Sequence, residues 1–130
     1  MSSVVTDASP YEIVGGGAGV RRVVDRFYDL MAQDPRYAEL RAMHAPDLAP
    51  MRESLSGFLS AWLGGPRDWF EQRPGACMMS LHARLAITGE TADQWADAMR
   101  RAIVDEGVDV ELGDRMGEAL SRMAGGMVRR

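Results

Sequence analysis

The chain has 130 residues, of which 46% are hydrophobic and 26% are charged. This length allows one domain with a buried core and is too short for two. Fifteen basic and nineteen acidic residues give a formal net charge of −4. Binding to nucleic acid relies on a basic surface that neutralises phosphates, so this charge argues against a nucleic-acid partner.

The cysteine content and the N-terminus bear on where the protein works. The one cysteine, Cys77, allows no intramolecular disulfide and no paired-cysteine attachment motif, and it fits a reducing cytoplasm, the expected location. Residues 1–10 contain no basic segment followed by an apolar run, so they are not a signal peptide and are predicted to be a disordered tail. No apolar run approaches the roughly 18 residues that span a membrane. We therefore expect a single domain over residues 11–130 and no membrane partner.

Glycine and proline divide the first half of the chain into helical segments. Glycines at positions 15, 16, 17 and 19 break the chain before an apolar pattern of helical spacing that ends at Asp34-Pro35. A short helical turn over 40–43 follows. Asp47 is the predicted N-cap of the next helix, whose apolar stripe ends before Gly64-Gly65-Pro66.

The second half repeats this organisation. A short helix is predicted around His82, after the break at Pro74-Gly75. Thr91 and Gln94 have the spacing of a capping box, with Thr91 as the N-cap of a helix whose apolar face begins at Trp95. A last helix carries apolar residues at the same spacing from 112 to 127. No segment alternates with period two for long enough to form a half-buried strand, so the predicted fold class is all-α.

His82 is the most informative single residue. An imidazole can bind a metal through one nitrogen and be oriented through the other. The alternative is a partly buried histidine that is satisfied by a backbone carbonyl. A metal site without an organic cofactor would need more ligands, and the nearest sulfur and oxygen donors, Cys77 and Glu90, do not stand at a familiar ligand spacing from it.

Several sequence motifs stand before and after this histidine along the chain, in a characteristic order. They are Tyr11-Glu12-Ile13-Val14-Gly15-Gly16, Arg26-Phe27-Tyr28, Arg41-Ala42-Met43-His44, Trp62-Leu63-Gly64-Gly65-Pro66, Glu71-Gln72-Arg73, His82 and Trp95. From about residue 11 to residue 123 the chain resembles a truncated haemoglobin of group II. The resemblance implies a two-over-two helical sandwich around haem b, in which His82 is the proximal ligand of the iron and the opposite face is open to a diatomic ligand.

The resemblance also assigns residues to the distal side. Tyr28 matches the tyrosine whose hydroxyl hydrogen-bonds the bound ligand; the alternative is a tyrosine at a helix seam with its hydroxyl in solvent. Trp95 matches the tryptophan that closes the distal pocket and can donate its indole N–H, and it is also a large apolar residue of the core. His44 stands where many relatives carry Tyr or Phe, and it either faces the pocket or lies in an exposed turn.

The pocket as a whole is expected to draw on many segments. The predicted haem-binding residues are Phe27, Tyr28, His44, Leu48, Met51, Leu55, Phe58, Trp69, Met78, Leu81, Arg84, Ile87, Trp95 and Met99. Met51 stands where this group usually has a small residue, so its thioether could crowd the pocket or bind the iron when no ligand is present. Arg84 and Arg73 are candidates for the haem propionates.

The implied function is a haem-binding globin that reversibly binds oxygen, NO and CO, in oxygen transport or in NO detoxification. One alternative is a haem enzyme, an NO dioxygenase or a peroxidase-like protein. The chain contains no fused reductase, so such an enzyme would need an external reductase. The other alternative is a helical interaction module without haem. The protein is expected to be a monomer or a homodimer.

Overall fold

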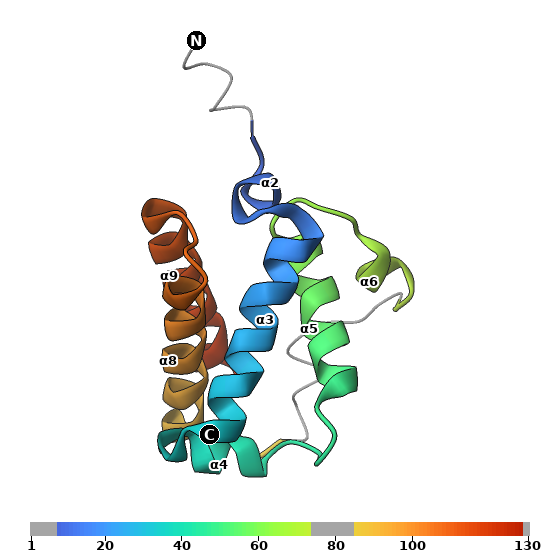
Figure 1. Ribbon diagram of the computed structural model, residues 1–130. Coiled ribbons are helices and arrows are strands. Elements are labelled where there is room, and N and C mark those ends of the chain that lie inside the picture. The colour runs from blue at the N-terminus through green and yellow to red at the C-terminus, as the bar shows by residue number, and fades with distance from the viewer. Residues whose placement is uncertain (1–7, 74–84, 129–130) are drawn as a thin grey trace.

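The computed structural model describes residues 8–73 and 85–128 (Figure 1). Its elements are α2 (Pro10–Val14), α3 (Gly16–Gln33), the 3-10 turn η1 (Pro35–Tyr37), α4 (Ala38–Ala42), α5 (Ala49–Trp62), α6 (Asp68–Glu71), α8 (Gly89–Asp105) and α9 (Val110–Gly126). These two ranges contain helices and turns and no β-strand, which agrees with the predicted all-α class. None of the described helices is long and apolar enough to cross a membrane.

Four long helices form two packed pairs. Helix α3 lies against α5, α8 lies against α9, and the pairs meet where α3 packs on α8 (Figure 1). This is the predicted two-over-two arrangement. The buried face of α3 includes Val20, Val24 and Phe27, and it meets Ala98, Met99 and Ala102 of the α8 face. Burial of these apolar stripes is the main force that holds the pairs together.

The first helix begins with a side-chain cap. The Ser9 hydroxyl accepts a hydrogen bond from the Glu12 backbone N–H, and the Glu12 carboxylate accepts one from the Ser9 backbone N–H at 2.9 Å. Pro10 occupies the first turn, where the missing N–H is not needed. Ser9 and Pro10, which the sequence analysis placed in the tail, thus belong to this first helical turn.

The turn between α2 and α3 contains fewer residues than the four glycines predict. Only Gly15, with φ of 112°, separates the two helices, and the helix already continues through Gly16, Gly17 and Gly19. A Cβ at Gly19 would lie 2.1 Å from the carbonyl oxygen of Val14. The glycine at position 19 therefore allows close approach of two helices and does not break the chain.

Two predicted helix starts differ from the structure. The capping box of α8 pairs Thr88 with Thr91, so Thr91 is the third residue of the helix and its assignment as N-cap is wrong by one turn. Gln94 is then free of a capping role, and its Oε1 accepts a hydrogen bond from the Leu40 backbone N–H at 3.1 Å. The N-cap of α5 is Leu48 instead of Asp47, although the Asp47 carboxylate still accepts from the Ala49 N–H at 3.0 Å.

Candidate functional site

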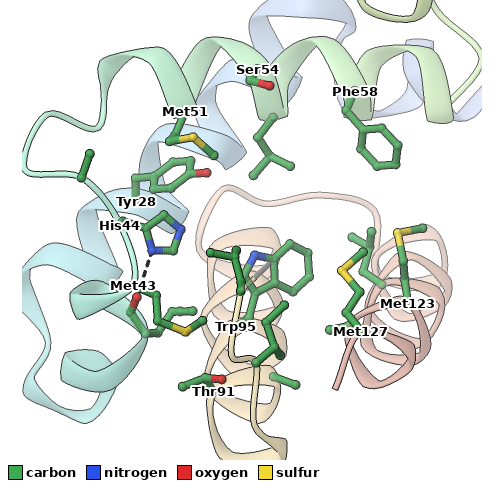
Figure 2. Close-up of a pocket in the computed structure, with 18 of the residues that line it drawn as sticks. Tyr28, Met43, His44, Met51, Ser54, Phe58, Thr91, Trp95, Met123 and Met127 are labelled. Carbon is green, nitrogen blue, oxygen red and sulfur yellow. Dashed lines mark hydrogen bonds between the residues drawn. The ribbon is translucent and has the colours of Figure 1, made fainter. Parts of the chain in front are cut away.

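A cavity of about 440 Å³ opens between the two helix pairs (Figure 2). This volume lies in the range of pockets that bind small molecules and cofactors. Its lining comes from α3, α4, α5, α6, α8, α9 and the loops beside α4 and α8. The walls are mainly aliphatic, aromatic and thioether side chains. The polar groups among them are few and belong to Tyr28, His44, Ser54, Thr91 and Trp95.

The predicted pocket residues fall into three groups. Those that line the cavity are Tyr28, His44, Met51, Leu55, Phe58, Trp69, Ile87 and Trp95. Phe27, Leu48 and Met99 are buried in the core and do not line it. His82, Met78, Leu81 and Arg84 lie outside the described residues, so the predicted proximal side is not part of this geometry.

Tyr28 is the most buried polar side chain of the cavity wall, with 2% of its surface exposed. Its hydroxyl points into the cavity (Figure 2), and no hydrogen bond joins it to another residue of the described ranges. Burial raises the pKa of Tyr28 to about 12, and the nearby Arg52 charge opposes this only in part. The phenol therefore stays protonated at neutral pH and is available as a donor.

Neighbouring side chains hold the Tyr28 ring. Phe27 meets it edge-on at a centroid distance of 4.9 Å, and His44 does so at 6.1 Å. The guanidinium carbon of Arg52 lies 5.7 Å from the ring centroid. Phe27 also makes an edge contact with Trp95 at 5.4 Å, so one buried ring supports both Tyr28 and Trp95 from behind.

His44 follows α4 in a tightly held loop. Its Nδ1 lies 2.9 Å from the Leu40 carbonyl oxygen, and the Leu40 N–H in turn donates to Gln94 of α8. The Arg41 guanidinium donates to the backbone carbonyls of Ala45 and Pro46, each at 3.0 Å. This loop geometry brings the half-buried imidazole to the cavity, next to Tyr28 (Figure 2).

The wall formed by α5 and α6 is built around Trp69. Its indole N–H donates to the Ser54 hydroxyl at 3.1 Å, and its ring meets Phe58 at 5.6 Å. A Cβ at Gly57 would lie 3.1 Å from Trp69, so the lack of a side chain there lets α6 approach α5. Arg73, a predicted propionate partner, donates to the Trp69 carbonyl at 3.1 Å and covers its ring.

Several lining residues were not predicted to face the pocket. They are Leu40, Met43, Ala45, Ser54, Leu85, Thr91, Ala92, Leu120, Met123, Ala124 and Met127. The last helix carried a sequence signal, because Leu120, Met123 and Met127 belong to its apolar stripe. That stripe looks the same whether it packs on another helix or on a ligand. Ser54 carried no such signal.

The cavity fits a large, flat and mostly apolar cofactor. Thioethers of Met43, Met51, Met123 and Met127 adapt to irregular shapes, and aromatic and aliphatic side chains line most of the remaining wall. Over the described ranges, no three His, Cys, Asp or Glu side chains come together as a metal site. The protein groups therefore suit an organic cofactor with a few polar contacts better than a bare metal ion.

The fold and the cavity define a truncated globin, the class of globins in which one pair of helices packs on a second pair. A family model described as "Bacterial-like globin" matches residues 9–129. The chain belongs to this family, and it is a truncated haemoglobin of group II. Membership implies a haem cofactor, and the lining just described fits one.

Characterised relatives and solved structures agree with this assignment. The chain is 30% identical over 104 residues to the group 2 truncated hemoglobin YjbI of Bacillus subtilis. The aligned region covers 80% of this chain and 76% of that protein. The cold-adapted truncated hemoglobin of Pseudoalteromonas haloplanktis superposes with a TM-score of 0.91 at 31% identity, over 95% of this chain and 99% of the other. The group II 2-on-2 hemoglobin of Agrobacterium tumefaciens gives a TM-score of 0.90 at 30% identity, over 94% and 95% of the two chains.

Proposed function

We propose that this protein holds haem b through His82 and reversibly binds oxygen, NO and CO on the side of the cavity that Tyr28 faces. The observation that carries the proposal is the Tyr28 hydroxyl, which belongs to a buried and protonated side chain and points into an apolar cavity. A hydroxyl that faces such a cavity is a donor for a polar ligand bound there. The matched solved structures include an oxygen-avid truncated haemoglobin from Bacillus subtilis.

The bound haem would supply an iron that takes up a diatomic ligand on its open face. The protein groups then decide how well that ligand is held. Tyr28 donates a hydrogen bond to a ligand that carries partial negative charge. Trp95 lines the same cavity, and its indole N–H bonds to none of the residues in the described part of the chain, so it serves as a second donor.

The remaining wall is mainly apolar. Leu55, Phe58 and the methionine side chains contribute no charged group to it. Hydrogen bonds from Tyr28 and Trp95 are stronger beside such a wall than they would be in open water. The lone cysteine fits a reducing compartment, and we propose the cytoplasm as the place where the protein works.

An absorption spectrum of freshly purified protein tests the haem proposal directly. We expect a Soret band, visible bands of a histidine-ligated ferrous haem, and a reversible shift with oxygen and with CO. Replacement of His82→Gly should abolish tight haem retention, and added imidazole should partly restore it. The variant should also be less stable, because a ligand that binds only the folded state stabilises it.

The matched control is His44→Phe, which removes the other histidine of the chain. It should keep the haem and its histidine-ligated spectrum. If His82→Gly retains a normal Soret band and a normal ferrous spectrum without imidazole, the proximal assignment is wrong. A purified protein that takes up no haem at all would overturn the whole proposal and favour a helical interaction module.

A further inference from the structure

A charged bridge joins α3 to α5 directly behind Tyr28. The Arg52 guanidinium on α5 donates from Nη1 to the Asp25 carboxylate at 3.0 Å and to the Asp25 carbonyl oxygen at 3.1 Å. It donates from Nη2 to the Asp29 carboxylate at 2.9 Å. Asp25 and Asp29 lie on either side of Tyr28 in the α3 sequence. Two nitrogens of one planar group are thus held by two carboxylates four residues apart.

This bridge places the guanidinium against the Tyr28 ring, 5.7 Å from its centroid. The Arg52 side chain is only 22% exposed, so its interactions are less screened than those of an open surface pair. A cation in this position attracts the aromatic ring. The edges of Phe27 and His44 limit the ring as well, so its freedom to turn is small.

We propose that Arg52 is a positioning residue for Tyr28, which keeps the phenol hydroxyl directed at the ligand in the cavity. The inference rests on the proposed function, because it assigns a purpose to the donor of that site. The phenol oxygen lies on the χ2 axis and is displaced together with the ring when χ1 changes. A contact that holds the ring against a change in χ1 therefore also holds the hydroxyl oxygen. Arg52 does not line the cavity, and it acts only through Tyr28.

The competing explanation is that Arg52 is a salt link that only holds α3 to α5. Arg21 offers a matched control for this possibility. Its Nε lies 3.0 Å from the same Asp25 carboxylate oxygen, but its side chain is 44% exposed. The cation–π contacts of the described residues belong to Arg52, Arg67, Arg73 and Arg101 and not to Arg21. Loss of Arg21 therefore removes one ion pair of Asp25 and no contact of the Tyr28 ring.

The test compares Arg52→Met, Arg21→Met, Tyr28→Phe and the double variant with Arg52→Met and Tyr28→Phe, all with haem bound. Two quantities are measured: the oxygen dissociation rate and the C–O stretching band of the carbon monoxide form, which responds to a nearby donor. Arg52→Met should broaden and shift this band and raise the oxygen dissociation rate about two- to fivefold or more, because two- to fivefold is the size of a cation–π contact at an exposed site and Arg52 is partly buried. Arg21→Met should change neither quantity.

The decisive comparison is made in the Tyr28→Phe background. If Arg52 acts through the hydroxyl, Arg52→Met should add nothing there to the dissociation rate or to the band. Arg52→Lys keeps the charge but cannot join two carboxylates with a planar fork, so it should restore only part of the wild-type behaviour. Equal effects of Arg52→Met with and without the Tyr28 hydroxyl, or equal effects of Arg21→Met and Arg52→Met, would overturn the inference.

Asp29→Asn is the second variant should Arg52→Met not fold. Asp29 holds one of the two bonded nitrogens of Arg52, and Asp25 holds the other, so loss of the Asp29 charge loosens the guanidinium without removing it. It should shift the C–O band in the same direction by a smaller amount, and an unchanged band would overturn the inference. Failure of the proposed function gives a different result from failure of the Arg52 inference. If the proposed function is wrong, the wild-type protein binds no haem, or Tyr28→Phe leaves the oxygen dissociation rate unchanged.

Discussion

His44 and Leu40 are joined by a contact of 2.9 Å between the imidazole Nδ1 and the backbone carbonyl oxygen. A carbonyl oxygen only accepts, so Nδ1 must carry the hydrogen. In the neutral ring, Nε2 is then an acceptor, and it becomes a donor only when the ring is protonated. The backbone of α4 therefore determines which tautomer His44 presents beside Tyr28.

This tautomer bears on the pH dependence of ligand binding. A second proton would have to go to Nε2, because Nδ1 already carries one. It would change the charge and the donors of the ring beside Tyr28, so the oxygen dissociation rate should change between about pH 8 and about pH 5.5. Stopped-flow measurement across this range provides the test.

His44→Phe should flatten that pH profile. Met51→Leu is the matched control from the same cavity wall, because a thioether does not titrate and the profile should survive its loss. A pH dependence that persists in His44→Phe would assign the titration to another group and leave His44 as a loop residue with a structural role.

Tyr28 and Trp95 are expected to control how long oxygen stays bound. A hydrogen bond to a charged group is worth roughly 1.5–3 kcal/mol, so loss of one donor should raise the oxygen dissociation rate about ten- to a hundredfold. Bound CO carries less charge, and its dissociation should change much less. Stopped-flow ligand displacement on Tyr28→Phe, Trp95→Phe and the double variant measures the dissociation rates of oxygen and of CO. Unchanged oxygen rates in all three variants would contradict this description of the cavity.

The raised pKa of Tyr28 predicts a loss of stability in alkali. Between pH 10, the ordinary value for a tyrosine, and about 12, the unfolded chain loses the phenol proton while the folded protein keeps it. The unfolded state binds fewer protons there, so the free energy of unfolding falls as the pH rises. From pH 9 to pH 11 the wild type should lose about 1 kcal/mol more than Tyr28→Phe. Guanidinium unfolding at matched haem content measures the difference, and parallel pH profiles would contradict it.

The close contact between α2 and α3 predicts that adding one methyl group at Gly19 lowers the stability of the protein. In Gly19→Ala the new methyl group would lie 2.1 Å from the Val14 carbonyl oxygen, so the two helices must move apart. We expect a destabilisation of about 1–3 kcal/mol, the usual result of overpacking. Gly89→Ala is the control, since a Cβ at Gly89 meets nothing within 4 Å. Thermal unfolding of both variants should show a lower Tm for Gly19→Ala alone.

The sequence by itself determined the helical class and the family. Apolar residues at helical spacing are a local pattern, so they predicted α3, α5, α8 and α9 without any knowledge of the packing. Dispersed motifs such as Arg26-Phe27-Tyr28 then led to the truncated haemoglobins, which the family comparison confirmed. The roles of His82, Tyr28 and Trp95 entered with that resemblance and stay predictions.

Local patterns were weakest at the helix ends. Thr88 and Thr91 can each cap a helix that runs toward Trp95, and the sequence does not say which of them does. Burial of Thr91 and Ala92 in the packed structure extends α8 by one more turn and makes Thr88 the cap. The tertiary contacts thus chose between two local solutions of similar quality.

Only the tertiary structure decided which side chains act together. Arg52 meets Asp25 across 27 positions, and Gln94 meets Leu40 across 54, so no spacing rule connects them. The tautomer of His44 follows from the path of one loop, and Ser54 accepts a hydrogen bond from Trp69 only because α6 packs on α5. Periodicity reports which face of a helix is buried, whereas contact between helices depends on how those faces meet in space.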